Sequence, residues 1–182
     1  MTKLKSMAVY CGHEFGNETS FARDAALVGE MLAHNGIRMV FGGGDVGLMG
    51  TVANGALNAG GEVIGVSTHN VVAKQEPVHT GVHVQVVNGV NERKQRMYEL
   101  SDAFIILPGG IGTLNELTDI MTMQQIGETK KPLFFLNTDN FWSPFANLFV
   151  HMQNCGFIED VRDYNIRITA TPAELEREIK NY

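Results

Sequence analysis

Short apolar runs alternate with helical patterns along the whole chain, and this alternation constrains the fold more than any other feature. The runs are three to five residues long and are rich in Val, Ile and Phe. They occupy residues 7–10, 39–41, 63–66, 84–87, 103–107, 133–136 and 166–169. Continuous apolar runs of this length are typical of strands in parallel sheets. We therefore expect each run to be a strand that is buried on both faces.

Helical patterns fill the intervals between these runs, roughly at residues 20–34, 48–59, 91–100, 113–126, 144–154 and 172–180. The long connection 68–81 carries no clear element. Parallel strands joined by right-handed crossover helices account for this order, and 182 residues is an ordinary length for one domain. The sequence predicts an α/β fold, a Rossmann-like doubly wound parallel sheet with helices on both faces, as a single domain over residues 1–182.

Composition excludes several classes of protein. Hydrophobic residues make up 44% and charged residues 19% of the chain, which is typical of a globular protein. The net charge is −6 and the basic residues are scattered apart from Arg93, Lys94 and Arg96, which argues against nucleic-acid binding. No stretch approaches the roughly 20 apolar residues of a membrane span, and Cys11 and Cys155 lack metal-site spacing. We expect a cytoplasmic protein without a metal.

Glycine-rich loops follow several of the expected strands, at the edge of a parallel sheet where ligands bind. After the second strand, Gly42, Gly44 and Gly47 spell G-x-G-x-x-G, a dinucleotide-binding pattern. The next strand ends "GVSTH", without the acidic residue that would bind a dinucleotide ribose, and this disfavours NAD or FAD. The alternative is that the glycines let the next helix pack close to the sheet, which is compatible with lining a small-ligand pocket.

The stretch "LPGGIGTLNEL" places three glycines ahead of a helix that we expect to begin at Thr113. Unpaired N–H groups and the helix dipole make such a helix start a phosphate site. The alternative is a capping box, in which Glu116 bonds back to the Thr113 backbone. A cap does not require three glycines, whereas close approach of an anion to the backbone does. Phosphate binding is therefore the favoured interpretation.

The stretch "NERKQRM" places Arg93 and Lys94 near the start of another expected helix. Cations are unfavourable there unless an anion compensates. The alternative is a solvated charged face shared with Glu92 and Glu99. If both loops open on the same edge of the sheet, Arg93 and Glu116 flank one pocket. The residues leave the two interpretations open.

These stretches, together with "VYCG", "GEVIGV", "TMQQIG", "KKPLFFLN" and "CGFI", occur in the order seen in a known family. The chain resembles the Lonely Guy family of cytokinin riboside 5′-monophosphate phosphoribohydrolases, formerly described as possible lysine decarboxylases. The resemblance implies hydrolysis of the N-glycosidic bond of an adenosine-type nucleoside 5′-monophosphate, giving free base and ribose 5-phosphate. It also implies a homodimer that uses no cofactor.

The resemblance assigns roles by motif. Arg93 and Glu116 correspond to the catalytic pair, and Lys94, Glu76 and Thr122 to further substrate contacts. The remaining substrate contacts lie on the glycine loop and the helix start: Gly109, Gly110, Ile111, Gly112, Thr113, Leu114 and Asn115. The chain departs from the family at His13 and Glu14, where small residues are usual, and at Asn91, Ile111, Asn115 and Met123.

Other functions fit parts of the sequence. The main alternative is a non-enzymatic nucleotide-binding or carrier module on the same fold, and a plain dimeric scaffold is a third class. Lysine decarboxylation is disfavoured because no segment singles out a lysine for a pyridoxal Schiff base. The helix that starts near Thr113 is apolar on more than one face, which suits either a partner subunit or a methionine-rich core.

Overall fold

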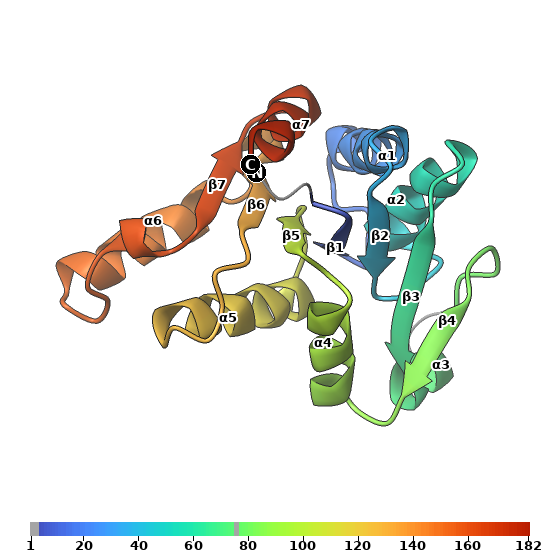
Figure 1. Cartoon of the computed structure of the whole chain (residues 1–182), viewed down its shortest axis with the longest axis horizontal. Coiled ribbons are helices and arrows are strands. Elements are labelled where there is room, and N and C mark those ends of the chain that lie inside the picture. Colours follow the sequence, from blue (N-terminus) through green and yellow to red (C-terminus); the bar gives the residue numbers. More distant parts are fainter. Residues whose placement is uncertain (1–3, 75–76) are drawn as a thin grey trace.

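A computed structural model describes residues 4–74 and 77–182, and these residues form one seven-stranded sheet (Figure 1). The strand order is β4-β3-β2-β1-β5-β6-β7, and each neighbouring pair is parallel. The strands are β1 (Ser6–Tyr10), β2 (Arg38–Phe41), β3 (Val63–Thr68), β4 (Val84–Val87), β5 (Ala103–Ile106), β6 (Leu133–Leu136) and β7 (Ile166–Thr169). From β1 the chain adds β2, β3 and β4 in turn on one side. It then returns to β5, on the other side of β1, and adds β6 and β7 outward from there. The β1–β5 boundary is therefore a topological switch point, where ligands bind in such sheets.

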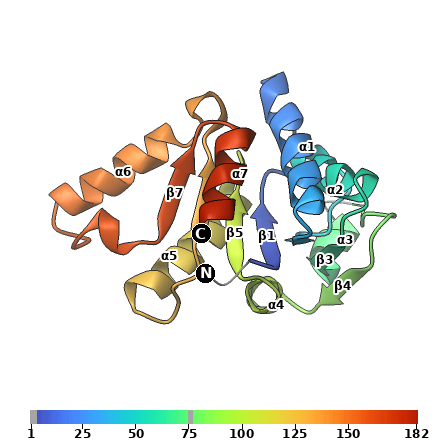
Figure 2. The same ribbon diagram turned by 45° about the horizontal axis from the view of Figure 1, so that its top comes forward.

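Helices cover both faces of the sheet, which confirms the predicted doubly wound fold (Figures 1 and 2). One face carries α1 (Thr19–His34), α2 (Gly47–Asn58) and α7 (Pro172–Asn181), and the other carries α4 (Val90–Glu99), α5 (Ile111–Gln125) and α6 (Ser143–Asn154). The remaining elements are short: α3 (His69–Lys74) and the 3₁₀ turns η1 (Thr138–Asn140) and η2 (Val161–Asp163). This right-handed winding places every strand-to-helix loop at the carboxyl edge of the sheet.

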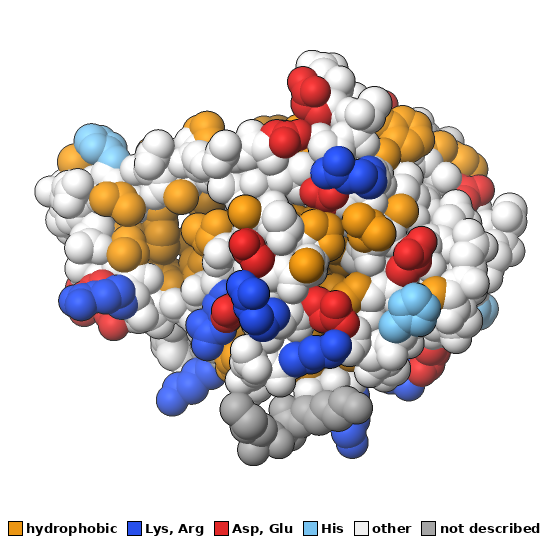
Figure 3. Space-filling model, turned by 90° about the horizontal axis from the view of Figure 1, so that it is seen from above, with side chains coloured by type: hydrophobic (Ala, Val, Ile, Leu, Met, Phe, Trp, Pro, Cys, Tyr) orange, Lys and Arg blue, Asp and Glu red, His pale blue; other side chains and the backbone are white. Residues whose placement is uncertain are grey.

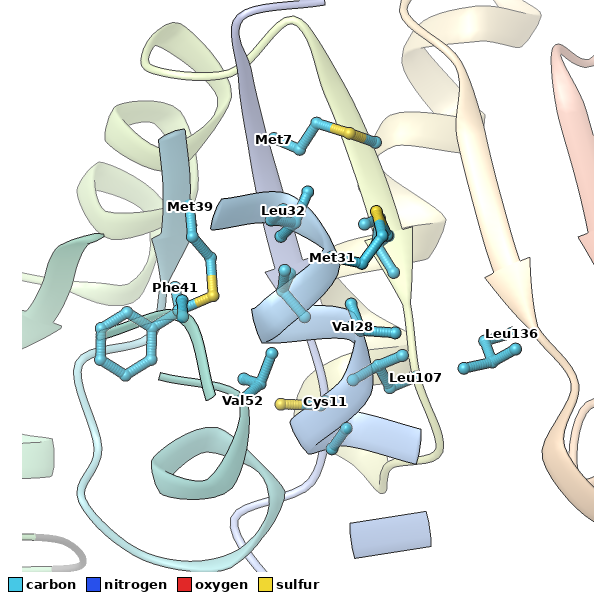
Figure 4. Packing of buried hydrophobic residues seen from close by; sticks show 14 of the residues in the cluster. Met7, Cys11, Val28, Met31, Leu32, Met39, Phe41, Val52, Leu107 and Leu136 are labelled. Atoms are coloured by element: carbon cyan, nitrogen blue, oxygen red, sulfur yellow. The ribbon is translucent and has the colours of Figure 1, made fainter. Parts of the chain in front are cut away.

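Alternate side chains of the central strands point to opposite faces of the sheet and belong to two separate hydrophobic clusters. Met7 of β1 lies beside Val28 and Leu32 of α1 (Figure 4), and Val9 belongs to the same cluster. Ala8 and Tyr10, the alternate residues of β1, belong to the cluster on the opposite face, with residues of α4 and α5. Because a fully buried aliphatic side chain contributes about 1.5–3 kcal/mol, the two clusters fix β1 from both faces. The carboxyl end of β1, which reaches the switch point, is thus held rigidly.

The structure corrects three sequence predictions. The strands at the two edges are not buried on both faces, because each has a strand neighbour on one side only: Val86 of β4 is 41% exposed and Ile168 of β7 is 52% exposed. The connection 68–81, expected to hold no clear element, contains α3. The helix expected from Thr113 begins at Ile111. The other element boundaries agree with the prediction to within about two residues.

Candidate active site

The glycine loop after β5 leads directly into an open helix start. Gly110 is the N-cap of α5, and within the described chain no side chain caps the helix there. The first backbone N–H groups of a helix have no intrahelical acceptor, so those of Ile111, Gly112 and Thr113 are available to a ligand. Thr113 is the third helical residue and not the N-cap, so the capping-box alternative is wrong. The helix start has the geometry of an anion site.

The three glycines of this loop serve two different purposes. A Cβ atom on Gly109 would lie 2.2 Å from Thr113 Oγ1 and 2.9 Å from the backbone nitrogen of Gly12. Gly109 therefore lets the β5 loop pack directly on the β1 loop, where Gly12 N–H donates to the Pro108 carbonyl at 3.0 Å. A Cβ atom on Gly110 or Gly112 would meet none of the described residues within 4 Å. These two glycines keep the approach to the helix start open.

Arg93 of α4 is held in a fixed position across the carboxyl ends of the strands. Its Nε donates to the carbonyl of Val66, within β3, and its Nη1 donates to Glu116 Oε1, each at 3.0 Å. Its Nη2 lies against Gly42, where a Cβ atom would come within 2.2 Å. The side chains of Arg93 and Glu116 are only 15% and 9% exposed. The structure thus joins, in one buried ion pair, the two residues that the sequence suggested would flank a pocket.

Glu116 opens onto a cavity of about 230 Å³ between α4 and α5. Tyr10, at the end of β1, also lines this cavity. Burial and the negative charge of Glu116 raise the pKa of the Tyr10 hydroxyl well above its usual value, so this hydroxyl stays protonated at neutral pH. Lys94 and Asp119 also line the cavity and form an ion pair of 2.5 Å. The cavity therefore offers a carboxylate beside neutral and charged hydrogen-bonding groups.

A second cavity, of about 210 Å³, lies on the other side of the glycine loop. Gly109 and Gly110 line it together with His13 and Glu14 of the β1 loop. His13 Nε2 lies 3.6 Å from Glu14 Oε1, and both side chains are mostly exposed. Two of the residues that depart from the family pattern are thus next to the expected phosphate cradle, where the negative charge of Glu14 would repel an anion.

The structure brings together most, but not all, of the residues assigned by resemblance. Arg93, Glu116 and the residues 109–113 share the carboxyl edge at the switch point. Lys94 pairs with Asp119 in the cavity beside Glu116. Three others lie on α5 outside the two cavities: Thr122, Asn115 and Leu114. Thr122 is exposed and donates to the Thr118 carbonyl. Glu76 lies outside the described residues.

Several residues that shape the site were not predicted from sequence patterns. Tyr10 looked like an ordinary strand residue, although its position at the end of a central strand is a usable signal. Asp119 lies three residues after Glu116, which places both on one face of a helix. The contact of Arg93 with the Val66 carbonyl could not be predicted, because a backbone carbonyl is present at every residue.

Solved structures with the same fold include a molybdenum cofactor binding protein from Rippkaea orientalis. It superposes with a TM-score of 0.73 at 24% identity and covers 100% of this chain and 98% of its own. A molybdenum cofactor carrier protein from Chlamydomonas reinhardtii gives a TM-score of 0.70 at 20% identity, covering 97% and 96%. At these identities the likeness concerns the fold alone.

Sequence comparisons are more specific. A family model described as possible lysine decarboxylase matches residues 49–179. The cytokinin riboside 5′-monophosphate phosphoribohydrolase LOG of Oryza sativa subsp. japonica is 38% identical over 183 residues, which cover 100% of this chain and 75% of the rice protein. The enzyme of that name from Rhodococcoides fascians is 40% identical over 155 residues, covering 85% and 78%. The chain therefore belongs to the LOG family, to which these cytokinin riboside 5′-monophosphate phosphoribohydrolases belong.

Proposed function

We propose that the protein hydrolyses the N-glycosidic bond of an adenosine-type nucleoside 5′-monophosphate to free base and ribose 5-phosphate. The observation that carries this proposal is the buried Arg93–Glu116 pair, which lies one helical turn from the open start of α5. The names of the rice and Rhodococcoides relatives support the same reaction. The description of the family as possible lysine decarboxylases does not match the hydrolysis of a glycosidic bond.

The phosphate of the substrate binds at the start of α5. The N–H groups of Ile111, Gly112 and Thr113 point toward this position, and the positive end of the helix dipole favours a dianion there. Docking the remote phosphate fixes the ribose against Glu116, so that binding energy is used to orient the reacting carbon. The enzyme should for this reason require the 5′-monophosphate and neglect the nucleoside.

Glu116 acts on the ribose. As the bond from C1′ to the base nitrogen breaks, its electron pair leaves with the base and positive charge develops on the ribose. A carboxylate beside C1′ stabilises this charge or accepts a proton from the attacking water. The water oxygen bonds to C1′ and one of its protons ends on the departing base. A guanidinium is a poor general acid, so Arg93 orients Glu116 and stabilises charge.

A product assay tests the reaction. AMP incubated with the protein should yield adenine and ribose 5-phosphate in equal amounts, and isopentenyladenosine monophosphate should yield its own base. Adenosine serves as the matched control, since it lacks the phosphate, and should stay intact. Chromatography of the free bases measures all three. Absence of base release from every monophosphate of a panel with AMP, GMP, CMP and IMP would contradict the proposal.

A phosphate-ligand carrier is the second candidate function. The observation that favours it is the open start of α5, whose N–H groups can hold a phosphate whether or not a bond is then broken. A carrier would bind AMP or ribose 5-phosphate and raise the melting temperature without any turnover. An enzyme would show the same shift together with base release, so the two measurements separate the candidates.

We also propose that the protein is a homodimer that associates through α6. Within residues 77–182, α6 contains no buried residue, although Leu148, Val150 and Met152 are apolar. An aromatic-lined cavity of about 600 Å³ separates α6 from β7, and Figure 3 shows hydrophobic side chains around a hollow on this side. On α5, by contrast, Leu117 and Ile120 are already buried in the core. Phe145 and Phe149 of α6 pack against the core, and the exposed apolar side chains on the rest of the helix suit a partner subunit.

Leu148→Asp should therefore convert the protein from dimer to monomer. The chain has a mass of 20.0 kDa, so light scattering should give about twice this mass for the wild type and the single mass for the variant. Leu27→Asp is the matched control, because Leu27 is 42% exposed on α1, at the opposite face. A wild-type monomer, or a dimeric Leu148→Asp variant, contradicts association through α6.

We further propose a cytoplasmic location, which rests on the sequence expectation. Among the residues that the structure describes, none of the helices is long and apolar enough to span a membrane. Cell fractionation with an antibody to the protein tests the location directly.

A further inference from the structure

A buried histidine, His79, lies against the glycine loop that follows β2. Its side chain is 4% exposed, and its ring packs edge-on against Phe41 with centroids 6.0 Å apart. His79 Nδ1 accepts a hydrogen bond from Gly81 N–H at 3.1 Å. In a neutral imidazole, the hydrogen then belongs to Nε2. This nitrogen lies 3.4 Å from Asp45 Oδ1, so the ring is directed at the far end of the loop.

Backbone hydrogen bonds attach the same segment to the glycine loop. Asp45 N–H donates to the Pro77 carbonyl at 3.1 Å, and His79 N–H donates to the Gly43 carbonyl at 3.0 Å. Gly44 and Val78 form an antiparallel bridge between these two bonds. The segment 77–79 is therefore paired with the loop, and its imidazole contacts the residues on both sides of the three glycines.

The glycine loop needs such an attachment because its own residues do little to fix it. Three consecutive glycines have the largest conformational freedom of any tripeptide, and Gly43 adopts a φ of +83°. The loop is also a wall of the site, since Gly42 packs directly against Arg93 Nη2. A movement of the loop would release the guanidinium from that side. The position of Arg93 thus depends on what holds the loop.

We propose that His79 is a positioning residue for the reaction, and that its contacts with Phe41 and Asp45 hold the glycine loop against Arg93. This inference rests on the proposed function, because it assigns His79 an effect on catalysis through Arg93. His79 itself does not touch the substrate. The sequence does not suggest this role, because His79 lies in the connection 68–81, which shows no helical or strand pattern.

The first test compares variants of the imidazole. His79→Ala should lower kcat for AMP about tenfold or more with a small change in KM, because small misplacements of a catalytic group cost up to about 10²-fold. His79→Gln places an amide N–H near the position of Nε2 and should recover kcat to within about threefold. Asp45→Asn keeps an oxygen atom beside His79 Nε2 and should resemble the wild type, whereas Asp45→Ala should resemble His79→Ala. The exposed His34 at the end of α1 provides the control His34→Ala, which should be neutral.

The second test does not depend on activity. The amides of Asp45 and His79, which form the two backbone bonds to the loop, should be protected from hydrogen exchange in the wild type and exchange at least tenfold faster in His79→Ala. Unchanged exchange overturns the proposal, and so does a variant that melts at a lower temperature but keeps the wild-type kcat when folded. If the wild type releases no base from any monophosphate, the proposed function fails, and the catalytic role of His79 fails with it. The exchange rates then still decide whether the ring holds the loop.

Discussion

Glu116→Gln should lower kcat for base release from AMP by at least about 10²-fold, the scale expected for a placed acid/base or charge-stabilising group. Glutamine has nearly the same shape and keeps an oxygen that accepts the hydrogen bond from Arg93 Nη1, which lies 3.0 Å from the wild-type carboxylate. It lacks the negative charge that stabilises the ribose as the glycosidic bond breaks. The loss of activity should therefore fall on kcat, and the melting temperature should also fall because Arg93 loses its buried counter-charge.

The matched control for this variant is Glu99→Gln. Glu99 is an exposed glutamate on α4 that interacts with Gln95 and Arg96, away from the glycine loop. Its variant should retain wild-type kcat and KM in the same product assay. Because the N–H groups at the start of α5 are unaltered in Glu116→Gln, KM for AMP should stay within about threefold of the wild type. A Glu116→Gln enzyme with near-normal turnover would remove Glu116 from the mechanism.

The periodicity of the sequence predicted most of the fold because it reports burial. Residues 103–107 and 133–136 are apolar throughout since helices cover both faces of the central strands. The same signal cannot tell which strand lies at an edge, so β4 and β7 were expected to be buried. The start of α5 was also misplaced, because its N-cap is Gly110, which has no side chain to mark a cap.

The candidate site was predictable only in part. The rule that crossover loops open on one edge allowed Arg93 and Glu116 to flank one pocket, although 23 residues separate them in the chain, but it did not decide between this and a solvated face for Arg93. No rule of periodicity gives the contact between His79 and Asp45, which joins two loops of irregular structure. The family resemblance included Thr122, yet its side chain is exposed and bonds to its own helix. Contacts between loops depend on tertiary packing, which local patterns do not encode.

Replacement of Arg93 provides the second large effect. Arg93→Ala should lower kcat/KM by at least about 10²-fold, since it removes the group that orients Glu116 and stabilises charge. It should also destabilise the fold by about 3 kcal/mol, the usual cost of removing one partner of a buried ion pair. A fall in melting temperature measures the loss of stability. Kinetics on the folded protein measure the loss of kcat/KM.

Arg93→Lys separates charge from geometry. The guanidinium serves the Val66 carbonyl with Nε and Glu116 with Nη1 at the same time, which a single ammonium group at the end of a flexible chain cannot reproduce. Lysine should therefore restore much of the stability but leave kcat at least about tenfold below the wild type. Full recovery of kcat by lysine would mean that positive charge alone is needed at this position, and that the planar anchoring by Val66 and Gly42 has no part in catalysis.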